Sequence, residues 1–103
     1  MATAADPIRL GVLYDFPQGD GGAGFEEALR LGIEVAGAGR LDRDVELVTH
    51  HARGLPAGTA AAVEEGFRDL CAAGVLAIVG PSISDNGIVV RDLAAEARVP
   101  CVN

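Results

Sequence analysis

The feature that most restricts the fold of this chain is an uninterrupted apolar run at 75–79, with the sequence Val-Leu-Ala-Ile-Val. Glycines at positions 74 and 80 bound the run, and its five residues have the length of a strand rather than of a helix. A strand without polar alternation is typical of one covered on both faces, as in parallel sheets flanked by helices. The run therefore predicts a central parallel strand in an α/β protein.

Segments with strand and helix periodicity alternate along the whole chain. The predicted strands are residues 8–14, 45–50, 75–79 and a short fourth at 99–102, and the predicted helices are residues 25–36, 59–73 and 85–97. A strand, a helix and a second parallel strand in this order form a right-handed βαβ unit. Successive units of this kind predict a doubly wound α/β fold with a parallel sheet of strand order 2-1-3-4.

The first predicted helix has a defined start, end and apolar face. Glu26 and Glu27 are expected in its first turn, where the helix dipole favours negative charge, and Gly37 and Gly39 are expected to end it. In the same way, Gly74 is expected to end the second helix. The apolar stripe predicted to face the sheet comprises Phe25, Ala28, Leu29, Gly32, Ile33 and Ala36.

Length and charge limit the classes of protein to be considered. The 103 residues allow one small domain or part of a larger one, and 50% of them are hydrophobic, as expected for a packed core. The net charge of −7, with no basic cluster, argues against binding to nucleic acid or to anionic membranes. No apolar run approaches the ~20 residues that span a bilayer, so membrane insertion is not expected.

The N-terminus and the cysteines bear on the compartment. Residues 1–7 lack the basic and apolar regions of a secretion signal and are expected to be disordered. Two alternatives stay open: a cytoplasmic protein, or a mature or truncated exported one. Cys71 and Cys101 lie among apolar residues and do not form the pattern of a disulfide framework, so both are predicted to be buried free thiols.

Three motifs that would indicate other functions are incomplete. The glycines of 19–24 match the G-x-G-x-x-G dinucleotide fingerprint, but an intervening loop separates them from the strand and no acidic residue ends the second strand. His50 and His51 are adjacent in a strand, so they point to opposite faces and do not predict a metal site. Ser82 and Ser84 lack the G-x-S-x-G context of a nucleophile. No cofactor, metal or catalytic residue is therefore predicted.

The segment 80–86 connects the buried strand to the last helix. It leaves the carboxyl end of a parallel strand, which is where open α/β sheets bind ligands. Ser84 is expected to cap the helix, and the backbone amides of the first turn form a polar rim suited to a ligand oxygen. This segment is therefore the strongest candidate for a binding site.

Two passages are similar to a known family. Gly-Arg-Leu-Asp-Arg-x-Val-Glu-Leu-Val at 39–48 and Gly-Val-Leu-Ala-Ile-Val-Gly-Pro-Ser at 74–82 resemble the type I periplasmic binding proteins of the leucine/isoleucine/valine-binding family, which are substrate-binding proteins of ABC transporters. The resemblance extends over residues 8–103. Members of that family are several times longer and close two lobes on a ligand. The resemblance therefore implies that residues 8–103 form part of the N-terminal lobe of a solute-binding domain.

The resemblance also implies which residues contact the ligand. In the family, the loop after the third strand supplies a hydroxyl to the ligand carboxylate, and this position falls on Ser84, with Ser82 within reach. The loop after the first strand faces the same cleft and contributes Phe16. Asp85 departs from the small or hydroxyl residues usual at its position. A carboxylate there would repel a ligand carboxylate by about 4 kcal/mol at ~4 Å and an effective dielectric constant of ~20. Either Asp85 points away, or the ligand is an amide, polyol, urea or cationic amine.

These implications predict a non-catalytic protein that captures a small polar solute, such as an amino acid or an amide, for the permease of an ABC transporter. Closure of two lobes about a hinge is the expected mechanism. The resemblance implies a periplasmic or other extracytoplasmic location. Two alternative functions stay open: a cytoplasmic sensor of the same fold that regulates a partner protein, and a small α/β enzyme, for which no set of acid, base and nucleophile is found.

Overall fold

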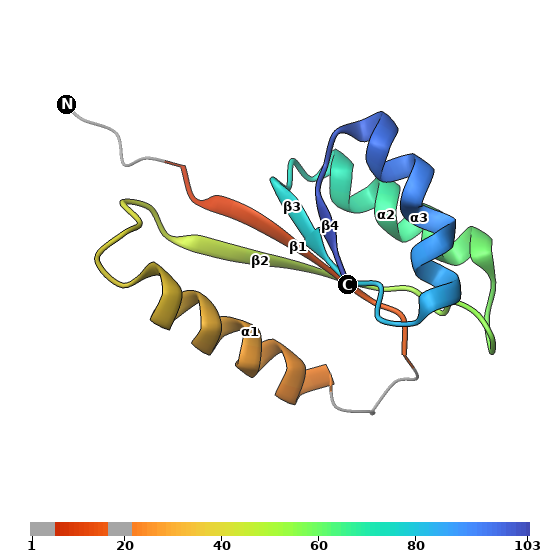
Figure 1. Ribbon diagram of the computed structural model, residues 1–103, viewed down its shortest axis with the longest axis horizontal. Coiled ribbons are helices and arrows are strands. Elements are labelled where there is room, and N and C mark those ends of the chain that lie inside the picture. The colour runs from red at the N-terminus through yellow and green to blue at the C-terminus, as the bar shows by residue number, and fades with distance from the viewer. Residues whose placement is uncertain (1–5, 17–21) are drawn as a thin grey trace.

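The structure, a computed structural model, describes residues 6–16 and 22–103 (Figure 1). Strands and helices alternate along the chain as predicted. The strands are β1 (Ile8–Tyr14), β2 (Val45–His51), β3 (Ala77–Val79) and β4 (Cys101–Val102), and the helices are α1 (Gly22–Gly37), α2 (Ala60–Ala72) and α3 (Ser84–Ala97). None of the helices in the described ranges has the length and apolar content to cross a bilayer. Residues 1–5 of the N-terminal segment, and Gly19 and Gly21 of the glycine motif, lie outside the described residues.

One parallel sheet joins the strands in the order β2-β1-β3-β4, which confirms the predicted order and the α/β fold class. β1 pairs with β2 along its whole length, as far as Tyr14 opposite His51. The other edge of β1 pairs with β3, and Val79 of β3 lies opposite Val102 of β4. The carboxyl ends of the strands therefore lie at one edge of the sheet, and the loops that follow them meet there.

β3 is shorter than the apolar run that predicted it. The strand begins at Ala77, and the chain bends at Leu76, whose side chain is 66% exposed. The prediction that the whole run 75–79 is covered on both faces is therefore wrong. The bend turns Leu76 outward, while Val75 and Ile78 on either side of it enter the core.

α1 begins earlier than its apolar pattern predicts. It starts at Gly22, so its first turn contains no acidic residue, and Glu26 and Glu27 belong to the second turn. The predicted stabilisation of a first turn by these glutamates is therefore wrong, because the apolar pattern marks where side chains meet the sheet rather than where the helical backbone begins. The end of the helix is as predicted: Gly37 is its last residue, and Gly39 has a φ of 69°, a backbone conformation that favours glycine.

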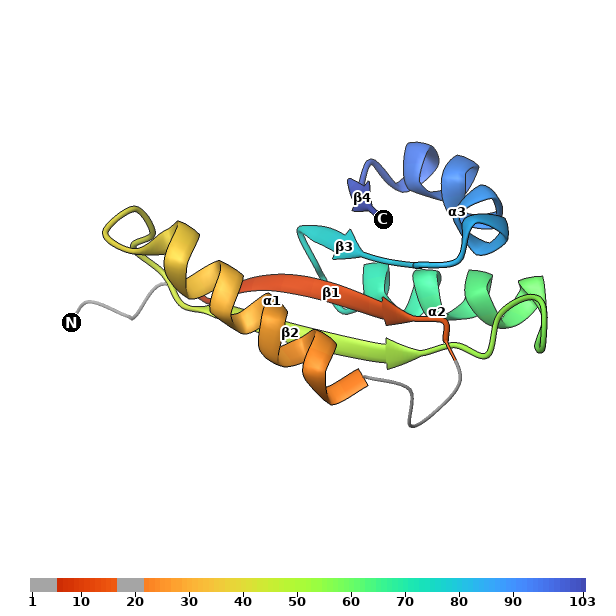
Figure 2. The ribbon, with the colours of Figure 1, turned by 60° about the horizontal axis from the view of Figure 1, so that its bottom comes forward.

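α1 lies on one side of the sheet, alongside β1 and β2, and α2 and α3 lie on the other side (Figure 2). The predicted apolar stripe of α1 is confirmed in part. Its half-buried residues are Phe25, Leu29 and Ile33, and its exposed residues are Ala28, Gly32 and Ala36. The helix therefore contacts the sheet over a narrower surface than its apolar arc provides.

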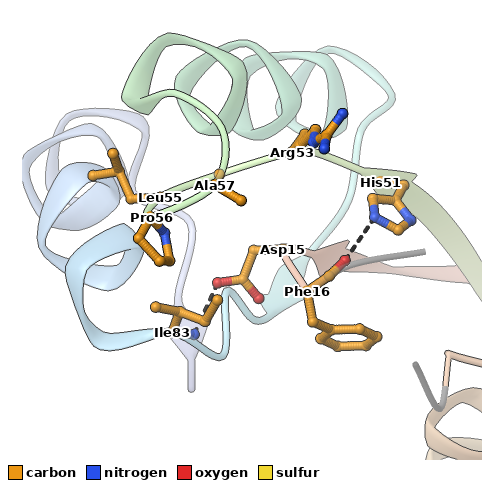
Figure 3. A pocket seen from close by; sticks show the side chains of 9 residues that line it. Asp15, Phe16, His51, Arg53, Leu55, Pro56, Ala57 and Ile83 are labelled. Carbon is orange, nitrogen blue, oxygen red and sulfur yellow. Dashed lines mark hydrogen bonds between the residues drawn. The ribbon is translucent and has the colours of Figure 1, made fainter. Parts of the chain in front are cut away.

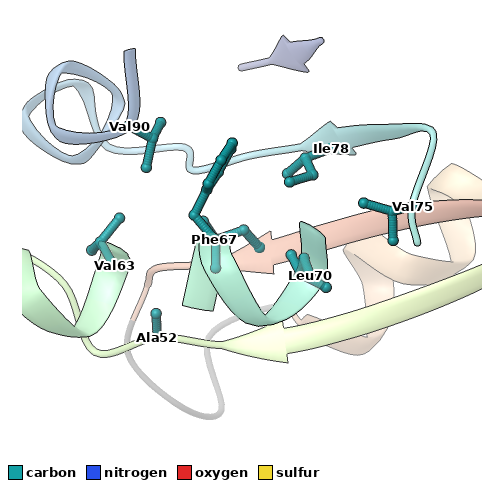
Figure 4. Packing of buried hydrophobic residues seen from close by; sticks show 8 residues of the cluster. Ala52, Val63, Phe67, Leu70, Val75, Ile78 and Val90 are labelled. Carbon is teal, nitrogen blue, oxygen red and sulfur yellow. The ribbon is translucent and has the colours of Figure 1, made fainter. Parts of the chain in front are cut away.

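The hydrophobic core lies between the sheet and the helices α2 and α3 (Figure 4). Its buried side chains come from both helices, from β1 and β3, and from segments next to the strands: Leu13, Ala52, Val63, Phe67, Leu70, Val75, Ile78 and Val90. Gly74, with a φ of 80°, follows α2 as predicted. This side of the sheet therefore holds the main packing of the chain.

Cys71 and Cys101 are free thiols, as predicted, but they are half-buried rather than buried. Both pack against the edge of the core, and burial raises the pKa of each thiol. The neighbouring Cys71 adds to the raised pKa of Cys101. The Sγ of Cys101 donates a hydrogen bond to the carbonyl oxygen of Gly80 at 2.8 Å, so this thiol helps to fix the end of β3.

Candidate functional site

Three loops meet at the carboxyl edge of the sheet. Asp15 and Phe16 follow β1, residues 52–59 connect β2 to α2, and residues 80–83 connect β3 to α3. Parallel pairing holds the first two loops together, because the amide of Ala52 donates to the carbonyl oxygen of Tyr14 at 2.7 Å just beyond the strands. In open α/β sheets this edge is the usual place for a ligand.

The carboxylate of Asp15 connects the first of these loops to the third. Its side chain is almost fully buried, at 3% exposure. Oδ1 accepts a hydrogen bond from the backbone amide of Ser82 at 2.8 Å, and Oδ2 accepts one from the amide of Ile83 at 2.8 Å. These amides lie at the N-terminal end of α3, where the helix dipole is positive. Asp15 therefore occupies the position at which a helix end would otherwise bind an anion.

Asn86 connects all three loops. Its side chain has no exposed surface, and its Nδ2 donates to Oδ2 of Asp15 at 2.9 Å and to the carbonyl oxygen of Leu55 at 3.0 Å. Its Oδ1 accepts a hydrogen bond from the amide of Leu55 at 2.8 Å. Gly54 makes room for this arrangement, because a Cβ at this position would lie 2.6 Å from Nδ2 of Asn86. The buried polar groups are thus paired with one another, which fixes the relative positions of the loops.

The loops surround a cavity of about 600 Å³ (Figure 3). This volume lies within the range of ~300–1,000 Å³ that is typical of small-molecule sites. Its wall combines apolar side chains with the ionisable groups of an aspartate, a histidine and an arginine. The lining residues are Asp15, Phe16, His51, Arg53, Gly54, Leu55, Pro56, Ala57 and Ile83.

Aromatic rings gather at one side of the cavity. The ring centroid of Tyr14 lies 5.4 Å from that of Phe16 and 5.8 Å from that of Phe25, with the rings edge to face. The His51 ring is 6.5 Å from that of Phe16, and its Nε2 lies 2.8 Å from the carbonyl oxygen of Phe16. The rings thus hold the start of the β1–α1 loop against β2.

Tyr14 is the buried member of this cluster. Its hydroxyl oxygen has no hydrogen-bond partner among the described residues. Burial raises the pKa of this hydroxyl above its ordinary value, the carboxylate of Glu26 raises it further, and Arg30 opposes the shift. Tyr14 therefore favours its neutral form and acts here as a packing residue.

The four residues predicted to bind ligand lie at different depths in this region. Phe16 lines the cavity. Ser82 contributes its backbone amide to Asp15 and has an exposed side chain. Ser84 and Asp85 are the first two residues of α3, and both are exposed. The structure thus brings Phe16 into the cavity wall and leaves Ser82, Ser84 and Asp85 outside the lining set.

Ser84 does not cap α3, contrary to the prediction. The capping position is held by Ile83, whose side chain makes no capping hydrogen bond. The carboxylate of Asp15 instead accepts from the amides of Ser82 and Ile83, so these two amides are not free for a ligand oxygen. Local sequence rules identify a hydroxyl near a helix start, but they do not identify a carboxylate that folding brings from a distant strand.

The chain is similar to an ABC transporter substrate-binding protein. A solved structure of an ABC transporter substrate-binding protein from Sphaerobacter thermophilus is 33% identical in sequence, and the match covers 93% of this chain with a TM-score of 0.73. The chain spans 26% of that protein. No protein-family model and no curated protein sequence matches the chain significantly. The four-stranded α/β fold thus matches a fragment of a substrate-binding protein lobe.

Several residues of this region were not found from the sequence, above all Asp15, His51, Arg53 and Asn86. A usable signal existed for Asp15, because it is an acidic residue directly after a predicted strand. His51, which the sequence does not mark as a metal ligand, is an exposed residue at the end of β2 and lines the cavity. Arg53 and Asn86 offer no local signal, since their roles depend on how the loops meet.

Proposed function

We propose that this chain is part of the N-terminal lobe of a periplasmic solute-binding protein of the leucine/isoleucine/valine-binding family. Its role is to capture a small polar solute and to deliver it to the permease of an ABC transporter, without catalysis. The observation that carries the proposal is the match of 93% of the chain, at 33% identity, to an ABC transporter substrate-binding protein.

The position of the cavity supports this function. It lies at the carboxyl edge of the parallel sheet and has a volume, about 600 Å³, that suits a solute of amino-acid size. In a two-lobe protein this edge faces the cleft, so the cavity forms one wall of the site and a second lobe closes over it. The buried Asp15–Asn86 network suits such a wall, because it fixes the three loops before the solute arrives.

Four residues are proposed to contact the solute. Phe16 packs against its apolar part from the cavity wall. The hydroxyls of Ser82 and Ser84, both exposed at the start of α3, bind its polar group as the second lobe closes. Asp85 adds a negative charge at the same rim and disfavours an anionic solute there.

Calorimetry on the complete gene product tests the proposal. A panel of amino acids, amides, amines and polyols is titrated, and at least one class is expected to bind with one-to-one stoichiometry. Ser84→Ala is expected to weaken this binding by about 1–3 kcal/mol, because a polar group of the solute loses its partner. Thr49→Ala, which removes an exposed hydroxyl from β2, is the matched control and is expected to leave the affinity unchanged.

The chain of 103 residues alone provides a further comparison. It is expected to bind the same solute far more weakly than the complete product, because one wall leaves the solute largely in water. Failure of every class to bind the complete product, or chemical conversion of a solute during the titration, would contradict the proposed function.

A further inference from the structure

Asn86 lies in a sequence that favours a chemical change of its side chain. The chain has two asparagines, and Asn86 is the one that a glycine, Gly87, follows directly. In such a pair the backbone nitrogen of the glycine attacks the side-chain carbonyl carbon, because glycine has no Cβ to obstruct the approach. A bond forms between this nitrogen and Cγ, and the Cγ–Nδ2 bond breaks with release of ammonia. Water then opens the cyclic succinimide to aspartate or isoaspartate, so the sequence marks Asn86 for deamidation.

The fold holds back both of the reacting groups. The attacking nitrogen belongs to Gly87, whose N–H is donated to the carbonyl oxygen of Ile83 at 3.1 Å at the start of α3. The leaving nitrogen, Nδ2 of Asn86, donates to Oδ2 of Asp15 at 2.9 Å and to the carbonyl oxygen of Leu55 at 3.0 Å. The Asn86 side chain also has no exposed surface, so water does not reach it. Both groups therefore become free to react only when the first turn of α3 opens.

The first turn of α3 is held by few bonds. Its capping residue, Ile83, makes no side-chain capping hydrogen bond, and the two residues before Asn86 are exposed. The turn is instead held from outside the helix, by the bonds that the amides of Ser82 and Ile83 donate to Asp15 and by the bonds of Asn86 itself. Protein segments open locally at a smaller cost in free energy than global unfolding. Local opening of this turn is thus the step that exposes Asn86.

The product of the reaction does not fit back into the polar network. Aspartate at position 86 has an oxygen in place of Nδ2, so the carbonyl oxygen of Leu55 and Oδ2 of Asp15 both lose a donor. Two carboxylates would then meet across the contact of 2.9 Å that Nδ2 makes, and a like charge at this distance disfavours the ionised form of both. Isoaspartate would add a methylene group to the backbone and interrupt the helical hydrogen bonds at Gly87.

From these observations we propose that Asn86 is a modification site. Its deamidation requires opening of the first turn of α3, and the product keeps the three loops at the carboxyl edge from closing again. The reaction consumes one water molecule and releases one molecule of ammonia, so it needs no oxidant and no cofactor. It converts a transient opening of the loops into a lasting one. This inference goes beyond the proposed function, because it does not depend on which solute the cavity takes.

Mass spectrometry of the complete gene product tests the proposal. Cleavage after arginine releases residues 69–91, in which Asn86 is the one side-chain amide, so the mass of this peptide reports deamidation of Asn86 alone. The protein is incubated at mildly alkaline pH, either native or unfolded in guanidinium chloride. Deamidation is expected to be at least about tenfold slower in the native protein, which corresponds to an opening free energy of at least about 1.4 kcal/mol. Gly87→Ala is expected to suppress the mass change in the unfolded protein, because its Cβ obstructs the attack.

A variant that carries the product from the start tests the consequence. In Asn86→Asp, the amides of Ser82 and Ile83 are expected to exchange their hydrogens at least about tenfold faster, because Asp15 no longer holds them. Asn103→Asp makes the same chemical change at an exposed residue and is the matched control, with unchanged exchange expected for these amides.

The possible results separate clearly. Equal rates of deamidation in the native and the unfolded protein, or no deamidation in either, would overturn the proposal. Unchanged exchange of the two amides in a folded Asn86→Asp variant would overturn it as well. If this variant does not fold, the two rates measured on the unmodified protein decide. None of these measurements involves a solute, so a failure of the proposed transport function would leave the deamidation site standing, and the reverse also holds.

Discussion

The two faces of the sheet are covered to very different extents. On the face of α2 and α3, Phe67 and Ile78 are at 1% exposure or less. On the face of α1, Leu31 and Val35 of the helix are 61% and 69% exposed. Val102 of β4 is also exposed. Successive side chains of a strand point to opposite faces, and its neighbour Cys101 packs against the core, so Val102 points away from the core. The stability of the chain is therefore concentrated on one face.

This difference shows what an amphipathic pattern can and cannot predict. The apolar arcs of α1 and α2 indicate helices of the same kind, but only α2 buries its arc. The apolar surface left on α1 is typical of one that contacts further protein, as expected when the chain matches 26% of a longer protein. The candidate site lies at the end of the well-packed face, where Asn86 is anchored.

The largest expected effect tests the packed face directly. Phe67→Ala removes a fully buried ring from the core and is expected to lower the free energy of unfolding by about 3–5 kcal/mol. Val35→Ala, on the exposed side of α1, is expected to change it by less than about 0.5 kcal/mol. Urea denaturation followed by circular dichroism measures both variants. Similar losses of unfolding free energy for the two variants would mean that the two faces of the sheet are equally packed, which would contradict the difference described above.

A smaller loss is expected at the polar end of the same face. Asn86→Ala leaves the amide and carbonyl groups of Leu55 without their side-chain partner, and it removes one of the two hydrogen bonds to Oδ2 of Asp15. The expected cost is about 2–3 kcal/mol in the same denaturation experiment. Asn103→Ala removes an exposed amide and serves as the control. If Asn86→Ala unfolds at the same urea concentration as the unmodified chain, the network does not hold the loops together.

The fold could be predicted because its signals are local. Apolar alternation at 8–14 and 45–50, and helical spacing between them, are properties of neighbouring residues, and the handedness of βαβ units then gives the strand order. The start of β3 could not be predicted in this way, because the apolar run continues through the bend at Leu76.

The edge of the sheet that carries the candidate site follows from the predicted topology, but the polar network of that site could not be predicted. The loop after the third strand was identified from topology alone, and Phe16 was identified from the resemblance. The pairing of Asp15 with Asn86 joins residues 71 positions apart, so no local pattern contains it. The same pairing explains why Ser84 was wrongly expected to cap α3: the carboxylate that meets the helix start comes from the end of β1.

The smallest expected effect concerns Tyr14, a buried residue on the face of α1. Its raised pKa means that the folded chain holds the phenolic proton more tightly than the unfolded chain does. The corresponding stability is complete below the ordinary tyrosine pKa of about 10 and is lost as the pH rises through the higher pKa of the folded state. Tyr14→Phe, which has no proton to lose, is expected to abolish this part of the pH dependence.

The ultraviolet absorbance of tyrosinate follows this group without interference, because the chain has one tyrosine and no tryptophan. Glu26→Gln is expected to lower the pKa of Tyr14 but to leave it above the ordinary value, since burial is the larger cause and the glutamate the second. Glu34→Gln, an exposed charge two turns further along α1, is the matched control. Titration of Tyr14 at its ordinary pKa would mean that α1 does not cover this side of β1. The two faces of the sheet would then differ even more in how well helices cover them than their exposed side chains indicate.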